Sequence, residues 1–278
     1  MNPNLFILGF PKCGTTSLAA MLKDVDYIYT PVNKEPHIFN QTLSEAKARL
    51  GLYTKGAKSG CLYYLDATPN YIKNIDGFFE VAANLGVPLS QAKFLVCVRD
   101  PAERYVSHYK HNFNRGTEPR PMDKVLDQEV DLYRKGMLHE AQYLDYSFYK
   151  EKIECLVQKV GGGNVAIIDI SDLNSPSLLA MKLQPFLGLN RQIELTSARA
   201  NEAYNPNSKL LNKILFSQNR VFSIMRKIVP KKYSQAIKAF FMRINNSSKM
   251  IVPKEDIGVE TLKTVLKNEM EFYESIAK

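Results

Sequence analysis

Near its N-terminus the chain has a short apolar run that leads into a turn bracketed by two glycines. The run is Leu5–Leu8, the glycines are Gly9 and Gly14, and three hydroxylated residues follow at Thr15–Ser17. An apolar run of this length predicts a buried strand, and the turn predicts a helix over residues 14–22. Free N–H groups at the start of a helix, together with the helix dipole, form an anion-binding site. The turn therefore favours an α/β fold in which the first strand delivers the chain to an anion site.

The remainder of the first two hundred residues alternates short apolar runs with helical patterns. The predicted strands are 62–65, 93–98 and 165–168, and the predicted helices are 101–114, 122–136, 140–158 and 175–186. This alternation is typical of a parallel sheet with crossover helices. We therefore expect a P-loop NTPase-like, three-layer α/β/α fold in which a parallel sheet is flanked by helices. We expect a single domain over 1–278, with an α/β core at 1–204 and a helical, basic C-terminal portion at 205–278.

The positive charge of the chain is concentrated in one segment. Lys and Arg number 37 and Asp and Glu 28, so the net charge is 37 − 28 = +9. Asn205–Lys254 holds eleven Lys or Arg and no Asp or Glu, and its apolar residues predict helices at about 210–229 and 237–244; a third is predicted at 259–276. The segment is either a solvent-exposed basic face, a contact for an anionic acceptor or the cofactor, or a docking surface for the anionic inner membrane leaflet.

Several classes of protein are not expected from the composition. No run of ~18 apolar residues is present, so a membrane-spanning helix is excluded, and the first residues lack the pattern of a signal peptide. The four cysteines are far apart and form no C-x-x-C pair, which argues against structural zinc and against a disulfide framework. We expect a cytoplasmic protein, with peripheral contact to the inner membrane face as an option.

The glycine-bracketed turn differs from the loop of an ordinary nucleotide kinase. A Walker A loop has Lys directly after its second glycine, where the side chain reaches the β- and γ-phosphates. Here Thr15 occupies that position, and Lys12 lies inside the loop. The turn alone could be a strand-turn-helix with capping hydroxyls, and a P-loop kinase or phosphotransferase remains the alternative enzyme.

A second candidate anion site follows the strand predicted at 93–98. The strand ends at Arg99, and Ser107 lies eight residues further, about two helical turns along the predicted helix. The guanidinium fork suits bidentate phosphate binding, and the serine adds a hydroxyl donor. The other interpretation of Arg99-Asp100-Pro101 is a salt bridge at the strand end followed by a helix cap.

Together these motifs resemble those of sulfotransferases that use 3′-phosphoadenylyl sulfate (PAPS). Phe10-Pro11-Lys12-Cys13-Gly14-Thr15-Thr16-Ser17 resembles their 5′-phosphosulfate loop, and Lys93–Ser107 resembles their 3′-phosphate motif. The likeness covers about residues 4–190 and extends to Phe186–Leu189, which is similar to the family's Phe-Leu-Gly-Leu ending. It implies transfer of a sulfuryl group from PAPS to a hydroxyl without a metal ion. The cofactor-binding residues implied are Lys12, Cys13, Gly14, Thr15, Thr16, Ser17, Arg99 and Ser107.

The resemblance also implies roles in catalysis. Lys12 would donate to the bridging oxygen as the bond between sulfur and that oxygen breaks. Lys34-Glu35-Pro36-His37 is similar to a segment of glycan-type and bacterial sulfotransferases in which the glutamate deprotonates the acceptor. Glu35 is therefore a candidate base, with a raised pKa expected. His37 is its rival, since a histidine is the base in the cytosolic branch, and a surface loop with a Glu–Lys pair is the non-catalytic alternative.

The acceptor predicted is a hydroxyl of a carbohydrate, a glycolipid or a lipid-linked sugar. Asp66-Ala67-Thr68-Pro69-Asn70-Tyr71 corresponds to a family stretch in which Lys stands where this chain has Ala67, and this change argues against heparan-like specificity. Thr68 and Tyr71 are candidates to line the acceptor cleft. His108, His111 and His139 have no acidic or Cys neighbours at metal-ligand spacing and are interpreted as surface or helix-packing residues. A basic module that binds nucleic acid or an anionic membrane is the non-enzymatic alternative, although nucleic acid is not the expected partner.

Overall fold

The computed structural model describes residues 2–57, 59–190, 192–197 and 258–277. The basic segment Asn205–Lys254, with the helices predicted at 210–229 and 237–244, lies outside the described residues.

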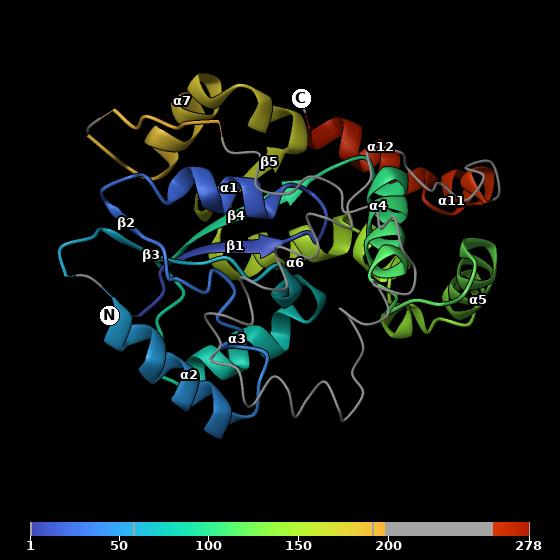
Figure 1. Cartoon of the computed structure of the whole chain (residues 1–278), viewed down its shortest axis with the longest axis horizontal. Helices are drawn as coiled ribbons and strands as arrows, with labels where there is room; N and C mark the ends of the chain where they lie inside the picture. The colour runs from blue at the N-terminus through green and yellow to red at the C-terminus, as the bar shows by residue number, and fades with distance from the viewer. Residues whose placement is uncertain (1, 58, 191, 198–257, 278) are drawn as a thin grey trace.

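A parallel sheet forms the centre of the molecule (Figure 1). Its five strands are β1 (Leu5–Gly9), β2 (Ile28–Tyr29), β3 (Tyr63–Asp66), β4 (Lys93–Val98) and β5 (Val165–Asp169). They lie in the order β2-β3-β1-β4-β5, and every neighbouring pair is parallel. Strand β1 is buried along its whole length, as expected for a strand with helices on both faces. The predicted parallel sheet is confirmed.

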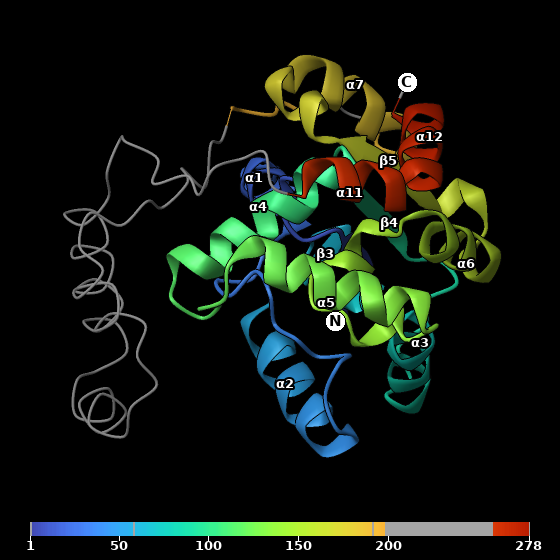
Figure 2. The same cartoon turned by 90° about the vertical axis from the view of Figure 1, so that its right-hand side faces the viewer.

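Helices cover both faces of the sheet. Helices α1 (Thr15–Leu22) and α7 (Pro176–Phe186) lie on one side, and α3 (Ile75–Asn84) and α6 (Lys150–Val160) lie on the other (Figures 1 and 2). Helix α2 (Leu43–Gly56) packs against α3. The result is the expected α/β/α layering, and the apolar residues of the strands form its core.

A second apolar cluster lies beside the sheet. It joins α4 (Pro101–Asn114), α5 (Met122–Arg134) and α11 (Val259–Val265) through buried residues that include Tyr105, Leu126 and Leu262. Helix α12 (Lys267–Ile276) returns to the sheet core with Phe272 and Ile276. The carboxylate of Glu269 on α12 accepts the N–H groups of Tyr149 and Lys150 at 2.7 and 3.0 Å, at the start of α6. The described C-terminal helices are thereby packed against the α/β core.

The structure differs from the sequence prediction in five regions. The helix predicted at 140–158 is instead two short 3₁₀ turns, η2 (Leu138–Glu140) and η3 (Leu144–Ser147), followed by α6. The chain is held out of a helix there because the Glu129 carboxylate accepts three successive N–H groups, of residues 142, 143 and 144, at 2.7–2.8 Å. The helix predicted at 259–276 is divided into α11 and α12, and β2, α2 and α3 were not predicted. The other 3₁₀ turns are η1 (Pro69–Lys73), η4 (Gly162–Asn164) and η5 (Ile170–Asn174).

Candidate functional site

The candidate site lies where the carboxyl ends of the strands meet. The chain order places β3 on one side of β1 and β4 on the other, so the loops that follow these strands diverge from a switch point in the topology. In open parallel sheets, ligands bind in the crevice outside the strand ends at such a point. The predicted residues follow this rule: Lys12 comes after β1, Glu35 after β2, Thr68 after β3 and Arg99 after β4. Residues far apart in sequence are therefore brought to one edge of the sheet.

The loop between β1 and α1 is shaped by two residues with left-handed backbone. Lys12 has φ +74° and Gly14 has φ +84°. A Cβ at Gly14 would lie 2.3 Å from Cδ1 of Leu173, so glycine is required for conformation and for space. Helix α1 begins directly afterwards at Thr15, and its first-turn N–H groups have no carbonyl within the helix to accept them. The loop thus has the form of an anion-binding turn.

Cys13 belongs to this loop, but its side chain is buried in the core. Its side chain is fully buried, and Sγ lies 3.7 Å from the hydroxyl of Tyr149. Burial raises the pKa of the Cys13 thiol to about 11, so it is a neutral packing residue. The backbone N–H of Cys13 donates to the carbonyl of Phe10 at 3.2 Å, which closes the turn.

The ammonium group of Lys12 contacts an imidazole on α4. Nζ of Lys12 lies 3.1 Å from Nδ1 of His111. Burial, together with the charges of Arg115 and Arg99, lowers the pKa of Lys12 to about 8. Burial and the charges of Lys12 and Arg115 lower the pKa of His111 to about 3. His111 is therefore neutral and accepts the hydrogen bond, which corrects its interpretation as a surface or helix-packing residue.

Arg99 and Ser107 belong to a series spaced four residues apart. Arg99 directly follows β4. Glu103, Ser107 and His111 follow on α4 at intervals of four, which places them on one helix face. The Nε and Nη2 atoms of Arg99 donate to Oε2 of Glu103 at 3.0 and 2.7 Å. Asp100 caps α4 by accepting the N–H of Glu103 at 2.8 Å. The salt bridge and the helix cap considered from sequence are thus present. The salt bridge joins the guanidinium of Arg99 to Glu103, on the same face of α4 as His111.

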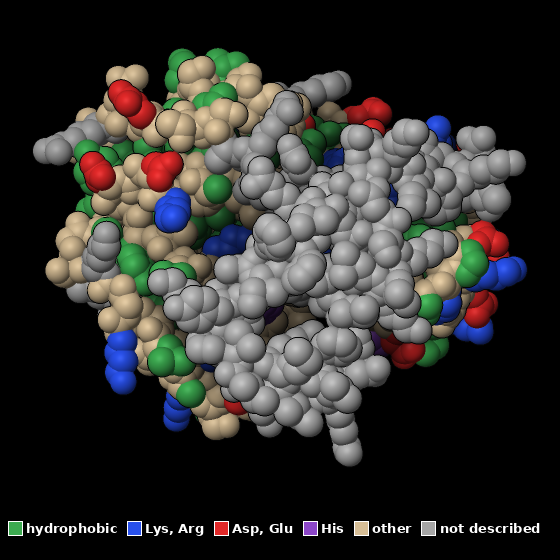
Figure 3. Space-filling view, in the orientation of Figure 1, with side chains coloured by type: hydrophobic (Ala, Val, Ile, Leu, Met, Phe, Trp, Pro, Cys, Tyr) green, Lys and Arg blue, Asp and Glu red, His purple; other side chains and the backbone are tan. Residues whose placement is uncertain are grey.

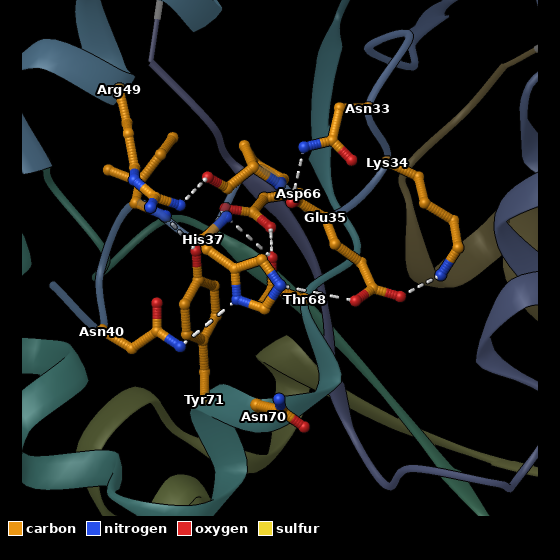
Figure 4. A network of polar contacts seen from close by, with 12 residues as sticks. Asn33, Lys34, Glu35, His37, Asn40, Arg49, Asp66, Thr68, Asn70 and Tyr71 are labelled. Carbon is orange, nitrogen blue, oxygen red and sulfur yellow. Dashed lines mark hydrogen bonds and ion pairs between the residues drawn. The ribbon is translucent and has the colours of Figure 1, made fainter. Parts of the chain in front are cut away.

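The segment 33–39, between β2 and α2, is held in place by several hydrogen bonds (Figure 4). The N–H of Ala67, after β3, donates to the carbonyl of Lys34 at 2.9 Å, and Nη1 of Arg49 on α2 donates to the carbonyl of Pro36 at 3.2 Å. The hydroxyl of Tyr71 accepts the N–H of Ile38 at 2.8 Å. Because three separate elements fix the backbone of this segment, its side chains are presented in a defined orientation.

Glu35 lies between two basic side chains. Oε1 of Glu35 accepts a hydrogen bond from Lys34, and Oε2 lies 3.5 Å from Nε2 of His37. Burial acts to raise the pKa of Glu35, but the hydrogen bonds and charges of His37 and Lys34 outweigh it and lower the pKa to about 2. The expectation of a raised pKa for Glu35 is therefore wrong. An ionised carboxylate held in this way is a weak proton acceptor.

The geometry also fixes the tautomer of His37. Nδ2 of Asn40 lies 3.3 Å from Nδ1 of His37. An amide nitrogen can only donate, so Nδ1 carries the lone pair, and the proton of the neutral ring lies on Nε2, toward Glu35. The basic atom of His37 thus faces away from Glu35 and toward Asn40, as Figure 4 shows.

The buried carboxyl group of Asp66 is connected to the segment 33–39 through hydrogen bonds. Asp66, at the end of β3, is fully buried and accepts from the hydroxyls of Thr68 at 2.6 Å and Tyr71 at 2.8 Å. Burial raises the pKa of Asp66 to about 7, despite the hydroxyl donors that lower it. The Thr68 hydroxyl in turn accepts the N–H of His37 at 3.4 Å. The predicted acceptor residues Thr68 and Tyr71 therefore hold the segment that carries Glu35 and His37.

Sequence reasoning missed Asp66, Asn40 and His111. A usable signal existed for His111, because it continues the spacing of four from Arg99 through Ser107. Figure 3 shows some Lys or Arg side chains near the centre of the viewed face, and further Lys and Arg side chains toward its edges together with Asp and Glu. Within the part of the chain that the structure describes, no group of three or more His, Cys, Asp or Glu side chains could hold a metal ion. Within the same ranges, no helix is long and apolar enough to cross a bilayer.

One protein family and several solved structures are similar to this chain. The family described as "Sulfotransferase domain" matches residues 2–243 of the chain. A sulfotransferase from Alicyclobacillus acidocaldarius is similar in structure, with a TM-score of 0.58 and 21% identity over 78% of this chain and 92% of that one. A sulfotransferase domain of the curacin biosynthetic pathway aligns at 12% identity with a TM-score of 0.47, over 96% of this chain and 98% of that one. Among curated protein sequences, none is significantly similar to this chain.

Proposed function

The chain belongs to the sulfotransferase domain family, and we propose that it moves a sulfuryl group from PAPS to a hydroxyl of a carbohydrate or of a sugar carried by a lipid. The observation that carries this proposal is the contact between Lys12, in the turn after β1, and His111, on the face of α4 that also carries Ser107. A turn rich in N–H donors, a lysine and an arginine suit a ligand with phosphate groups at two places.

The residues present fit PAPS, which supplies the sulfuryl group when bound. The N–H groups at Thr15–Ser17 would hold its 5′-phosphosulfate, and Lys12 would leave His111 to donate to the oxygen from which the sulfuryl group departs. Arg99 and Ser107 would hold the 3′-phosphate. The pair that Arg99 makes with Glu103 would be exchanged at low cost, because the Glu103 side chain is 64% exposed and exposed pairs contribute only about 0–1 kcal/mol.

We propose His37 as the base that takes the acceptor proton, with Glu35 as its positioning residue. Nδ1 of His37 carries the lone pair, and the carboxylate of Glu35 lies 3.5 Å from Nε2. When Nδ1 gains a proton, the resulting imidazolium is stabilised by that carboxylate, as in other His–carboxylate pairs. The low pKa of Glu35 supports this division of roles, because the carboxylate stays ionised at neutral pH.

Variants separate the two candidates for the base. We expect His37→Gln to lower kcat by about 10²-fold or more, the usual contribution of a general base. Glu35→Gln keeps a hydrogen-bond acceptor near Nε2 and should lower kcat less. A larger loss for Glu35→Gln than for His37→Gln would return the role of base to Glu35.

The donor is tested by thermal unfolding with adenosine 3′,5′-bisphosphate and, separately, with ATP and Mg²⁺. Ligand at ~100 times its Kd stabilises a fold by about 2.7 kcal/mol. We expect a shift with the bisphosphate that is lost in Lys12→Ala and in Arg99→Ala. Lys135→Ala is the matched control, since Lys135 pairs with Asp131 on the surface of α5. Stabilisation by ATP and Mg²⁺ alone would favour a P-loop kinase and refute the proposal.

The basic segment Asn205–Lys254 supplies a further proposal about location. Its charge of +11 favours contact with an anionic surface such as the inner leaflet of a membrane. The segment lies outside the described residues, so this proposal rests on sequence alone. Binding to vesicles that contain anionic lipid, and its loss when Lys and Arg residues of the segment are replaced by Gln, would test it.

A further inference from the structure

A cavity of about 230 Å³ lies beside the candidate base, between the segment after β2 and helix α3. Four amide side chains line it: Asn40, Gln41, Asn70 and Asn74. Pockets for drug-sized ligands are typically about 300–1,000 Å³. The cavity therefore has room for one small ring and not for an extended chain.

The floor of the cavity is aromatic and rigid. Phe39, Tyr71 and Phe78 contribute to it, and their ring centroids lie 5.0–5.7 Å apart. Each of the three side chains is only 1% exposed, so the rings are fixed by packing. The packed rings give the cavity a fixed shape, and the amide side chains supply its polar contacts.

The polar lining is neutral. No Lys, Arg, Asp or Glu is among the described residues that line the cavity. A carboxamide offers both donors and an acceptor, so it matches a hydroxyl, which also donates and accepts. A charged ring, whether anionic or cationic, would enter without an opposite charge in the described lining to pair with. The lining therefore selects for an uncharged ligand that bears hydroxyl groups.

The cavity adjoins the basic atom of the candidate base. Asn40 lines the cavity and also donates to Nδ1 of His37 at 3.3 Å. Tyr71 lines it and accepts the N–H of Ile38 at 2.8 Å. In Figure 4 the labelled side chains of Asn40, Tyr71 and Asn70 lie on one side of His37, and Glu35 lies on the other. A hydroxyl of a ligand in the cavity could thus replace Asn40 as the hydrogen-bond donor to His37.

We propose that this cavity binds an uncharged, hydroxyl-bearing ring of the acceptor, of the kind found in a neutral hexose, and presents one of its hydroxyls to Nδ1 of His37. The proposal rests on the proposed sulfotransferase function and deepens it, since it names where the acceptor binds and excludes uronic, sulfated and amino sugars at this position.

The test uses the full chain saturated with adenosine 3′,5′-bisphosphate. The probes are methyl β-glucoside and methyl β-galactoside, with methyl β-glucuronide and glucosamine as charged counterparts, and binding is measured by saturation-transfer NMR. We expect at least one neutral hexoside to bind, and both charged sugars to bind at least about tenfold more weakly.

Two variants connect binding to the cavity. Val81→Phe places a larger side chain in the cavity from α3 and should abolish hexoside binding, and Asn70→Ala removes one amide and should weaken it about three- to tenfold. Glu80→Gln on the same helix is the matched control, since Glu80 is exposed and does not line the cavity. Thermal stabilisation by the bisphosphate reports whether each variant is folded, and unchanged stabilisation is expected in all three.

The two proposals fail in different ways. If the bisphosphate stabilises the protein but neither neutral hexoside binds, the cavity proposal is overturned and the proposed function stands. Binding of the glucuronide as tightly as the glucoside also overturns it, as does hexoside binding that both Val81→Phe and Asn70→Ala leave unchanged. If the bisphosphate does not stabilise the protein, the proposed function fails, and hexoside binding that Val81→Phe abolishes would still assign the cavity.

Discussion

Asp66 should give the fold a measurable dependence on pH. Its carboxyl is fully buried at the end of β3, and burial raises its pKa from 3.8 to about 7 against the opposing effect of hydrogen bonds from Thr68 and Tyr71. Above pH 3.8 the unfolded chain releases a proton that the folded protein still holds. The free energy of unfolding therefore falls as the pH rises from about 4 to about 7 and no longer depends on this group above that range.

The magnitude follows from the two pKa values of Asp66. Each pH unit between 3.8 and about 7 contributes 1.36 kcal/mol, so the whole effect is about 4 kcal/mol. Between pH 5 and pH 7.5 the titration of Asp66 is expected to lower the free energy of unfolding by about 2.5 kcal/mol. This is a large share of the 5–15 kcal/mol that typically stabilises a domain.

The assay is urea unfolding of the wild type and of Asp66→Asn at pH 5 and at pH 7.5. The asparagine side chain has nearly the same shape and does not ionise in this range, so other titrating groups cancel in the comparison. We expect the stability of the wild type, relative to the variant, to fall by about 2.5 kcal/mol between the two pH values. Asp127→Asn, at an exposed position on α5, should show no such change.

This reasoning is refuted if the free energies of unfolding of the wild type and of Asp66→Asn differ by the same amount at both pH values. Such a result would mean that Asp66 ionises at its ordinary pH in spite of its burial. If the hydroxyl donors outweighed burial, the pKa of Asp66 would lie below 3.8, and the relative stability of the wild type would then rise with pH only below about pH 4.

Three further predictions concern the anion site and the C-terminal helices. The affinity for adenosine 3′,5′-bisphosphate, measured by calorimetry, should fall as the pH rises above about 8, because Lys12 loses its charge there and must regain a proton on binding; Lys12→Arg should remove this dependence near pH 8. Gly14→Ala should lower stability by about 1–3 kcal/mol and weaken bisphosphate binding, because the new Cβ would lie 2.3 Å from Leu173 at a φ of +84°; an unchanged melting temperature would contradict this. Glu269→Ala should lower the free energy of unfolding by about 2–3 kcal/mol, because two N–H groups at the start of α6 lose their acceptor, and Glu269→Gln, which keeps one acceptor oxygen, should lose less.

The parts of the fold that could be predicted are those determined by local sequence. The strand at 93–98 was predicted to its last residue because an apolar run ends at Arg99 and Pro101, and a proline favours the first turn of a helix. The same holds for the turn after β1, where Gly14 and the hydroxylated residues mark a helix start. In both cases neighbouring residues alone determine where the strand ends or the helix begins.

The parts that could not be predicted depend on distant residues. The helical pattern at 140–158 is overridden because Glu129 accepts the N–H groups of residues 142–144, and no local signal contains that information. The pKa of Glu35 is a similar case. The sequence places Lys34 beside it, but whether burial or the neighbouring charges dominate is decided by the fold of the whole segment.

The carboxylates near the site differ in how easily an anionic ligand could displace them. Glu103 pairs with Arg99 on the surface, and its side chain is 64% exposed. Glu35 is 33% exposed, is held by Lys34 and His37, and lies on a segment fixed by β3, α2 and Tyr71. A phosphate approaching Arg99 therefore has only a weak, screened pair to replace, whereas Glu35 keeps its partners. The positive charge of Arg99 is thus available to the ligand, and the negative charge of Glu35 stays beside His37, where a proton taken up by the imidazole needs it.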